Sequence, residues 1–293
     1  MGAAVPADTQ VLVGGYPSLE QLTAAPVDAL VLPYAGLPSR TRSLLLEHAP
    51  RLPVYNQHHN AVAVAECAVA LTLALAKHVV PMDRALRAHD WRPRYAPDPA
   101  LRLAGTRALV LGFGAIGRRV ARLLDAVGLD VTATRRSLDA PAIAGDIRLL
   151  PAALTRAALP HAQILVLCLP HTADTDGLLD AGALAALAPG SLVINVARAG
   201  VIDEQALFDA LSSGHLGGAA LDVWWRYPDA ASRASTPAST LPFHALPNVV
   251  LSPHRSGHDR TVEDDRLRDL LVTLRALAGG EAPPHRVNVA RGY

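Results

Sequence analysis

The sequence has few cysteines and no excess of charge of either sign. It contains only two cysteines, Cys67 and Cys168, and both lie in apolar stretches. We therefore expect buried, unreactive thiols rather than a disulfide or a nucleophile. The formal net charge is +1, and arginine is spread along the chain. This distribution provides no basic surface for nucleic acid or anionic lipid, so neither is an expected partner.

Long apolar runs and targeting signals are also missing. No run approaches the roughly 20 residues that a membrane-spanning helix needs. The first six residues, MGAAVP, lack the basic and apolar regions of a signal peptide. The sequence has no internal repeat or charged block. We expect a cytoplasmic globular protein with no membrane partner, and 293 residues are enough for two domains with sizeable cores.

The first part of the chain alternates short apolar runs with helical patterns. Apolar runs occur at Val11–Val13, Ala29–Leu32 and Leu52–Tyr55, and helical patterns at Ser18–Leu22 and Arg40–His48. This alternation predicts a small parallel α/β layer.

The second part predicts a larger sheet. An Ala/Leu/Val-rich segment, Val64–His78, is too long for a strand and predicts a buried helix. Helical patterns at Ala181–Leu187 and Glu204–Ser212 then alternate with strands, which indicates a doubly wound parallel Rossmann sheet. The tail Val262–Leu277 is helical and is expected to return to the first domain. The six expected strands are Ala108–Leu111, Val131–Thr134, Ile164–Cys168, Leu192–Asn195, Gly218–Asp222 and Val249–Leu251.

The glycine motif directly after Ala108–Leu111 indicates dinucleotide binding. Gly112 permits a tight turn, Gly114 lets the backbone approach a pyrophosphate, and Gly117 lets the following helix pack against the strand. Ala115 and Ile116 complete the turn. A GxGxxG pattern alone is weak, but here a strand precedes it and a helical pattern follows.

Four further motifs resemble the D-isomer-specific 2-hydroxyacid dehydrogenase family. They are Asn60–Glu66, Cys168–Leu178, Asn195–Glu204 and Ser252–Gly257. The resemblance implies a smaller, discontinuous flavodoxin-like α/β substrate domain (1–62 and 258–293) and a Rossmann domain (63–257), closing over a cleft. It also implies a nicotinamide cofactor and a homodimer that pairs through the Rossmann domains.

Two residues match the family's catalytic pair. Arg198 follows Leu192–Asn195, so its guanidinium stands where a substrate carboxylate and carbonyl oxygen can be held by forked hydrogen bonds. His254 follows Val249–Leu251 and can exchange a proton with the carbonyl oxygen. The alternatives are an arginine in a surface salt bridge and an ordinary loop histidine, and the surrounding motifs favour the catalytic roles.

The substrate side is expected in the first domain. The turn Tyr34, Ala35 and Gly36 matches the family's loop whose backbone amides hold the carboxylate. His58 and His59 would face the same cleft, but neighbours on an extended chain point in opposite directions, so at most one touches substrate. No metal site is expected, because no cysteine or carboxylate accompanies them at ligand spacing.

The expected catalytic glutamate is replaced. In most of the family a glutamate lies five residues after the residue that corresponds to Asp222, and here that position is Tyr227. A carboxylate raises the pKa of a neighbouring histidine and fixes its tautomer, whereas a phenol can only form a hydrogen bond with it. Either Tyr227 orients His254 in an altered but working site, which we favour, or the substrate needs no protonated histidine, as in formate dehydrogenases.

The cofactor position also departs from the family. Eighteen residues past Gly117, where a carboxylate would bind the ribose of NAD, stand Arg135, Arg136 and Ser137. These groups attract a 2′-phosphate, so NADP(H) is preferred over NAD(H), the alternative being a solvated arginine pair. The resemblance assigns further cofactor contacts to Thr134, Leu169, Pro170, Thr175, Val196, Ala197, Asp222 and Gly257.

The expected activity is hydride transfer between NAD(P) and a small 2-keto or 2-hydroxy acid of the glyoxylate or hydroxypyruvate kind. Arg198 would bind the substrate, His254 would act as acid and base, and Tyr227 would replace the glutamate. One alternative is oxidation of formate or another small anionic hydride donor. The other is a non-catalytic protein that senses the dinucleotide, which the presence of both Arg198 and His254 disfavours.

Overall fold

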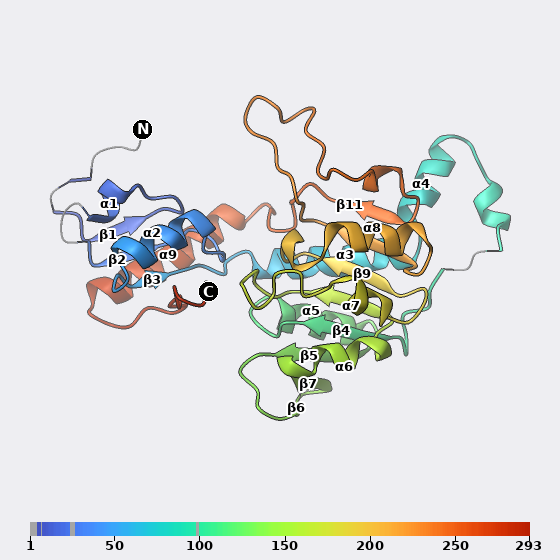
Figure 1. Cartoon of the computed structure of the whole chain (residues 1–293), viewed down its shortest axis with the longest axis horizontal. Helices are drawn as coiled ribbons and strands as arrows, with labels where there is room; N and C mark the ends of the chain where they lie inside the picture. Colours follow the sequence, from blue (N-terminus) through green and yellow to red (C-terminus); the bar gives the residue numbers. More distant parts are fainter. Residues whose placement is uncertain (1–4, 7, 24–26, 98–99) are drawn as a thin grey trace. The chain divides into compact units, whose positions relative to one another are not determined.

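The computed structural model describes residues 5–6, 8–23, 27–97 and 100–293. The chain forms two compact units, residues 1–60 with 258–293 and residues 61–257, and Figure 1 colours them along the sequence. The chain passes from the first unit to the second after Asn60, whereas the sequence predicts this boundary after residue 62. Residues 1–4 of the first six residues, which lack the features of a signal peptide, lie outside the described residues, as do Asp98 and Pro99.

The first unit contains a three-stranded parallel sheet in the order β1-β2-β3. Val11 pairs with Ala29 and Leu30 with Val54, so the expected parallel layer is confirmed. Its core includes Leu22 and Leu45 from the helices. The elements are β1 (Val11–Val13), α1 (Leu19–Thr23), β2 (Ala29–Val31), α2 (Ser39–His48), β3 (Val54–Tyr55) and α9 (Val262–Ala278).

The second unit contains an eight-stranded sheet in the order β11-β10-β9-β8-β4-β5-β7-β6. Every pairing is parallel except that of β6 with β7. The six strands expected from the sequence all form, and the doubly wound Rossmann sheet is confirmed. The strands are β4 (Arg107–Leu111), β5 (Asp130–Arg135), β6 (Ala142–Ala144), β7 (Ile147–Pro151), β8 (Ile164–Leu167), β9 (Leu192–Asn195), β10 (Gly218–Leu221) and β11 (Val249–Leu251).

The sequence did not predict the β6–β7 pair. β6 is a three-residue strand whose central Ile143 is 76% exposed, and β7 ends in Pro151. The apolar run of β6 is only three residues long, and Arg148 interrupts that of β7, so neither has the long continuous apolar run of a strand buried on both faces. This pair extends the sheet beyond β5, so β6 is one edge strand and β11 is the other.

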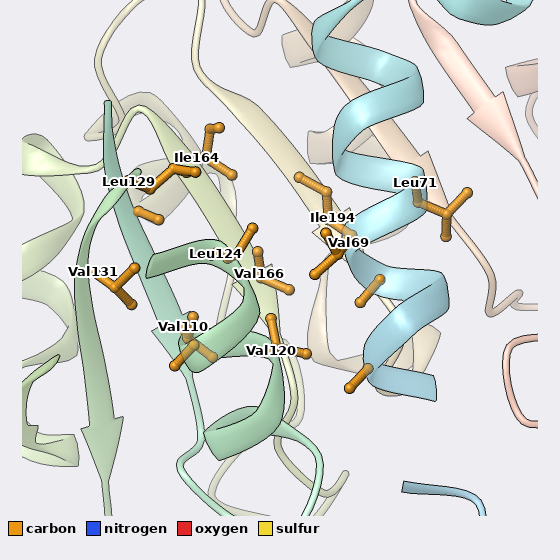
Figure 2. Packing of buried hydrophobic residues seen from close by; sticks show 14 of the residues in the cluster. Val69, Leu71, Val110, Val120, Leu124, Leu129, Val131, Ile164, Val166 and Ile194 are labelled. Atoms are coloured by element: carbon orange, nitrogen blue, oxygen red, sulfur yellow. The ribbon is translucent and has the colours of Figure 1, made fainter. Parts of the chain in front are cut away.

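Helices cover both faces of this sheet. Val120 and Leu124 of α5 pack with Val69 of α3 against β4, β8 and β9 in one core (Figure 2). A second core on the other face includes Leu184 of α7 and Leu207 of α8. The helices are α3 (Ala61–Ala76), α4 (Val79–Arg87), α5 (Gly117–Ala126), α6 (Thr155–Ala158), α7 (Ala181–Ala185) and α8 (Glu204–Ser212), with 3-10 turns η1 (Arg92–Tyr95), η2 (Ala152–Leu154), η3 (Leu159–His161), η4 (Ala199–Val201) and η5 (Phe243–Ala245).

The helix bounds follow local capping and composition. Asp180 and Asp203 cap α7 and α8 by accepting hydrogen bonds from backbone N–H groups at 2.8 and 2.7 Å. Within the described residues, no single helix is both long and apolar enough to cross a membrane. α3 and α4 pass that test only as a pair, which is bent by 63°.

The strand order places a switch point between β4 and β8. From β4 the chain continues to β5 and β7 on one side, and from β8 to β9, β10 and β11 on the other. Open α/β sheets bind ligands at the carboxyl ends of the strands beside such a point. The loops after β4, β5, β9, β10 and β11 all leave the sheet at this edge, so the candidate residues of the second unit are gathered there.

Candidate active site

The turn after β4 has the geometry that a dinucleotide requires. Gly112 has a φ of +96°, and a Cβ there would lie 2.8 Å from the carbonyl oxygen of Cys168. A Cβ on Gly117 would lie 1.8 Å from the carbonyl oxygen of Gly112, so only glycine allows this close packing. At Gly114 a Cβ would meet nothing within 4 Å. The backbone is therefore open to a pyrophosphate at the N-terminus of α5, and the residues present fit that group.

The end of β5 lies directly beside this turn. Thr134 pairs with Leu111 in the sheet, and its hydroxyl accepts a hydrogen bond from the Gly112 backbone N–H at 3.3 Å. Arg135 donates from Nε to the Ser137 hydroxyl at 2.8 Å, and both side chains are exposed. This contact holds a guanidinium and a hydroxyl side by side at the edge where the ribose of a dinucleotide would lie.

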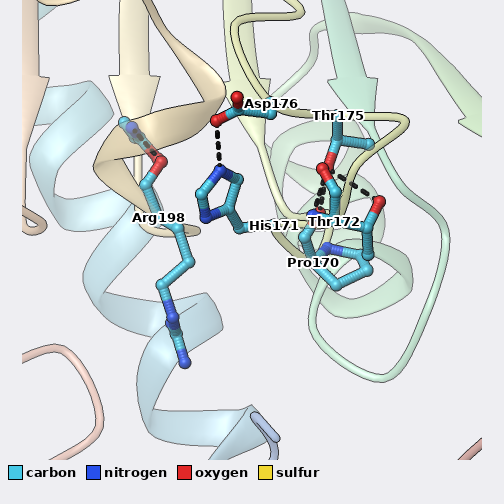
Figure 3. Close-up of polar contacts among 7 residues, drawn as sticks. Pro170, His171, Thr172, Thr175, Asp176 and Arg198 are labelled. Atoms are coloured by element: carbon cyan, nitrogen blue, oxygen red, sulfur yellow. Dashed lines mark hydrogen bonds and ion pairs between the residues drawn. The ribbon is translucent and has the colours of Figure 1, made fainter. Parts of the chain in front are cut away.

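The loop after β8 folds into a turn around Thr175 (Figure 3). Its hydroxyl donates to the Pro170 carbonyl oxygen at 2.7 Å and accepts from the Thr172 backbone N–H at 2.8 Å. His171 contacts Asp176 through Nε2 at 2.7 Å. These hydrogen bonds hold the turn between Pro170 and Thr175 in place.

Arg198 follows β9 and lies immediately before η4. The buried Asn195 fixes the turn, because its side chain accepts from the Ala197 N–H at 3.0 Å and donates to the Arg198 carbonyl oxygen at 3.1 Å. Val196 and Ala197 are buried. The Arg198 side chain is exposed and donates one hydrogen bond, to the Ala197 carbonyl oxygen at 2.7 Å. Among the described residues, Arg198 has no carboxylate within ion-pair distance, so the guanidinium can accept an external one.

Asp222, which the sequence also predicts to contact the cofactor, holds the loop that carries His254. It is fully buried at the end of β10, and its carboxylate accepts from the Ser252 hydroxyl. It also accepts from the backbone N–H groups of Arg255 and Ser256 at 2.9 and 3.1 Å. Its oxygens are thus committed to the residues on both sides of His254, and Asp222 is a positioning residue.

His254 and Tyr227 are in direct contact. The phenol oxygen of Tyr227 lies 2.8 Å from His254 Nδ1, and it also accepts a hydrogen bond from the Trp224 backbone N–H at 3.2 Å. Burial of the phenol, and to a smaller extent Asp222, raises the pKa of Tyr227, although the Trp224 N–H and Arg198 oppose this shift. His254 has a φ of 57°, a left-handed conformation that is uncommon outside glycine, although asparagine, aspartate and histidine adopt it more often than other residues.

Replacing Asp222 with asparagine is expected to lower the free energy of unfolding by about 3 kcal/mol, because two backbone donors would lose a charged acceptor. The measurement is urea unfolding. Asp203→Asn is the matched control: Asp203 caps α8, and asparagine caps helices equally well, so little change is expected. Equal stability of the two variants would contradict the positioning role of Asp222.

The first unit contains the other candidate residues. The turn Tyr34–Gly36 follows β2, and Asn56 fixes it by donating to the Ala35 carbonyl oxygen at 2.6 Å. Burial raises the pKa of Tyr34 to about 12. The His58 ring packs edge-on against His285, with ring centroids 4.6 Å apart. Burial lowers the pKa of His59, so this side chain favours the neutral form.

Sequence reasoning missed Gln57. This side chain is 1% exposed, and neither its amide nitrogen nor its amide oxygen has a hydrogen-bond partner among the described residues. His59 Nδ1 and the Tyr34 hydroxyl are buried in the same condition. Unsatisfied buried polar groups are costly, so the Gln57 amide is a candidate for contact with a polar ligand. No motif signals a lone glutamine, which is why the sequence did not identify it.

Comparisons with known proteins identify the family of the chain. Residues 69–256 match the family model "D-isomer specific 2-hydroxyacid dehydrogenase, NAD binding domain". The chain is 33% identical to D-3-phosphoglycerate dehydrogenase of Mycobacterium leprae over 86% of this chain and 44% of that protein. It is 29% identical to glyoxylate reductase of Pyrococcus furiosus over 83% of this chain and 71% of that protein.

A solved structure agrees as well. The D-isomer specific 2-hydroxyacid dehydrogenase of Xanthobacter autotrophicus Py2, in complex with NADPH and MES, superposes with a TM-score of 0.81 and 26% identity, covering 99% of this chain and 87% of that one. The chain therefore belongs to the D-isomer specific 2-hydroxyacid dehydrogenase family. It spans less than half the length of the curated phosphoglycerate dehydrogenases that it matches.

Proposed function

We propose that this protein transfers a hydride between NAD(P) and a small 2-keto or 2-hydroxy acid of the glyoxylate or hydroxypyruvate kind. The observation that carries the proposal is the exposed guanidinium of Arg198, which has no carboxylate partner among the described residues. Arg198 follows β9, and β9 is the neighbour of β10, the strand that precedes Tyr227. The similarity to a glyoxylate reductase supports the substrate class.

Arg198 and His254 of the second unit have different roles in the proposed reaction. Arg198 binds the substrate carboxylate and carbonyl oxygen and stabilises negative charge that develops on that oxygen. His254 supplies the proton that the oxygen receives in reduction and removes it in oxidation. The bound nicotinamide would supply or accept the hydride, held by the glycine turn and the end of β5.

The proposal is tested by turnover. NADPH oxidation is measured with a panel of 2-keto acids including glyoxylate and hydroxypyruvate, and NADP reduction is measured with formate in parallel. Turnover of at least one keto acid is expected. Activity with formate alone would replace the proposal with oxidation of a small anionic donor. Tight cofactor binding with both panels silent would favour a dinucleotide-sensing protein instead.

We further propose that NADP(H) is the preferred cofactor. Arg135 and Ser137 lie together beside the glycine turn, and a guanidinium with a hydroxyl suits a 2′-phosphate. The Xanthobacter relative was solved with NADPH, which supports the same choice. A carboxylate at this position would repel the phosphate.

Replacing Arg135 with alanine is expected to lower kcat/KM for NADPH by about 10- to 100-fold, the equivalent of one charge-assisted hydrogen bond of about 1.5–3 kcal/mol. The value for NADH should change less than threefold, because NADH has no 2′-phosphate. Steady-state kinetics with both cofactors measures the ratio. Arg122→Ala, an exposed arginine on α5, is the control. A wild-type preference for NADH would contradict the cofactor proposal.

We also propose a homodimer that pairs through the second unit. Val79, Met82 and Leu86 recur at helical spacing on α4 and are 52%, 40% and 50% exposed. Trp91 and Tyr95, which follow on the chain, are 60% and 79% exposed. An apolar helix face with exposed aromatic residues is typical of a protein interface.

The double substitution Met82→Asp and Leu86→Asp is expected to convert the dimer to a monomer, since two buried charges without partners oppose association. Light scattering after size-exclusion chromatography gives the mass. Leu123→Asp, on α5, is the control, because Leu123 is similarly exposed at 38%. A wild-type protein that is already monomeric at micromolar concentration would refute the proposal.

A further inference from the structure

The hydrogen bonds around Tyr227 assign the position of its proton. The Trp224 backbone N–H can only donate, and it donates to the phenol oxygen at 3.2 Å. The other polar contact of that oxygen is His254 Nδ1 at 2.8 Å. A phenol has one proton to give. The arrangement that uses every donor therefore directs the Tyr227 proton to Nδ1, and the histidine carries its own proton on Nε2.

Further hydrogen bonds hold the two loops that carry Tyr227 and His254. Trp224 also donates from Nε1 to the Ser252 carbonyl oxygen at 2.8 Å, which ties the loop after β10 to the loop after β11. Asp222 holds the backbone on both sides of His254. The contact between Tyr227 and His254 is thus set by both loops rather than by one mobile side chain.

Two charged groups from the packed elements influence the phenol. Arg198, after β9, stabilises negative charge on the Tyr227 oxygen, and Asp222, at the end of β10, opposes it. The Tyr227 side chain is 51% exposed, and its partial burial outweighs both charges and raises the pKa of Tyr227 above its usual value. The phenol therefore keeps its proton across the neutral and mildly alkaline range. It releases the proton only as His254 gives up its own proton to the substrate.

We propose that Tyr227 is the proton source of the site, and that neutral His254 passes this proton to the substrate from Nε2. This inference rests on the proposed reduction of a 2-keto acid and goes beyond it. An imidazolium is the acid where a carboxylate contacts the histidine, whereas here the acid is a phenol acting through a neutral imidazole. Tyr227 is a positioning residue in this scheme, and His254 is the catalytic one.

The proton transfers balance. As the carbonyl carbon is reduced, the Nε2–H bond breaks and the substrate oxygen gains that proton. The Tyr227 O–H bond breaks in the same step, and Nδ1 gains its proton, so the imidazole stays neutral and Tyr227 becomes a phenolate. The Trp224 N–H and Arg198 stabilise the phenolate. A proton from water then reaches Nε2, the Nδ1 proton returns to Tyr227, and the starting state is restored.

The scheme fixes how reduction depends on pH. An isolated histidine loses its acidic proton near pH 6.5, and a reaction that needs imidazolium slows about tenfold per pH unit above that value. A relay that starts from tyrosine keeps its proton to about pH 10. Reduction by the wild-type protein should therefore be level from pH 6.5 to 9.

The first test needs no turnover. Nitrogen-15 NMR of labelled histidine at pH 8 reports which ring nitrogen is protonated, and His254→Asn assigns the resonance among the 12 histidines. The wild type should have the proton on Nε2 and a hydrogen-bonded, unprotonated Nδ1. In Tyr227→Glu the proton should move to Nδ1, because a carboxylate only accepts. A wild-type His254 protonated on Nδ1 would overturn the proposal.

The second test is the pH profile of kcat/KM for keto-acid reduction. Tyr227→Phe keeps the ring but removes the proton source, so its rate should fall about tenfold per pH unit above pH 6.5. Tyr293→Phe, which removes a hydroxyl outside the second unit, should keep the level wild-type profile. Parallel profiles of wild type and Tyr227→Phe would refute the relay. Absence of any keto-acid turnover would instead refute the proposed function, and the NMR result would still decide the tautomer.

Discussion

Replacing Arg198 with glutamine is expected to lower kcat/KM for a 2-keto acid by about a thousandfold, within the range measured when a charge-stabilising donor is removed from an active site. The guanidinium has two tasks, binding the carboxylate and stabilising charge on the carbonyl oxygen. Loss of the first raises KM, and loss of the second lowers kcat. Both parameters should therefore change, in steady-state measurements at saturating NADPH.

Arg198→Lys separates the two tasks. Lysine keeps the positive charge but not the planar fork, so it should restore part of the affinity for the carboxylate and little of kcat. Arg233→Gln, an exposed arginine in the loop after β10, is the matched control and should leave both parameters unchanged. If Arg198→Gln retained kcat within threefold, the guanidinium would not act on the reacting carbonyl.

Replacing His254 with asparagine is expected to lower kcat by about 100- to 10,000-fold, the usual contribution of a positioned acid or base. Asparagine suits this test because it tolerates a left-handed backbone, and His254 has a φ of 57°. The loop should therefore keep its shape, and the Asp222 contacts to Arg255 and Ser256 should remain. The melting temperature should stay close to that of the wild type.

His89 offers a control with the same backbone conformation. Its φ is 59°, and its side chain is exposed after α4. His89→Asn should change neither kcat nor stability. A His254→Asn variant with wild-type kcat would show that the proton comes from another group, and a large loss of stability in that variant alone would point to a structural role for the imidazole.

The glycine turn shows what a sequence motif can predict. Each glycine was assigned a task from its spacing, and the close contacts at Gly112 and Gly117 and the open space at Gly114 match those tasks. Backbone conformation and steric limits are local, so three residues in a strand-to-helix context are sufficient. The buried parallel strands were predictable for a similar reason, because each is a continuous apolar run.

Contacts between distant loops were less predictable. The count of five residues from Asp222 predicted Tyr227 beside His254, and the structure gives 2.8 Å. The same reasoning predicts that Asp222 contacts the cofactor, but it did not predict that the carboxylate accepts hydrogen bonds from the loop that follows β11. Which donor reaches a carboxylate depends on how two loops fold together, and no spacing along the chain contains that information. The catalytic and cofactor roles themselves stay predictions.

Asp222 separates the placement of the histidine from the choice of its chemical partner. The carboxylate accepts hydrogen bonds from the backbone on both sides of His254, and these contacts do not involve the side chain at position 227. Substitutions of Tyr227 are therefore expected to change the partner of the imidazole while the backbone of its loop keeps the Asp222 contacts.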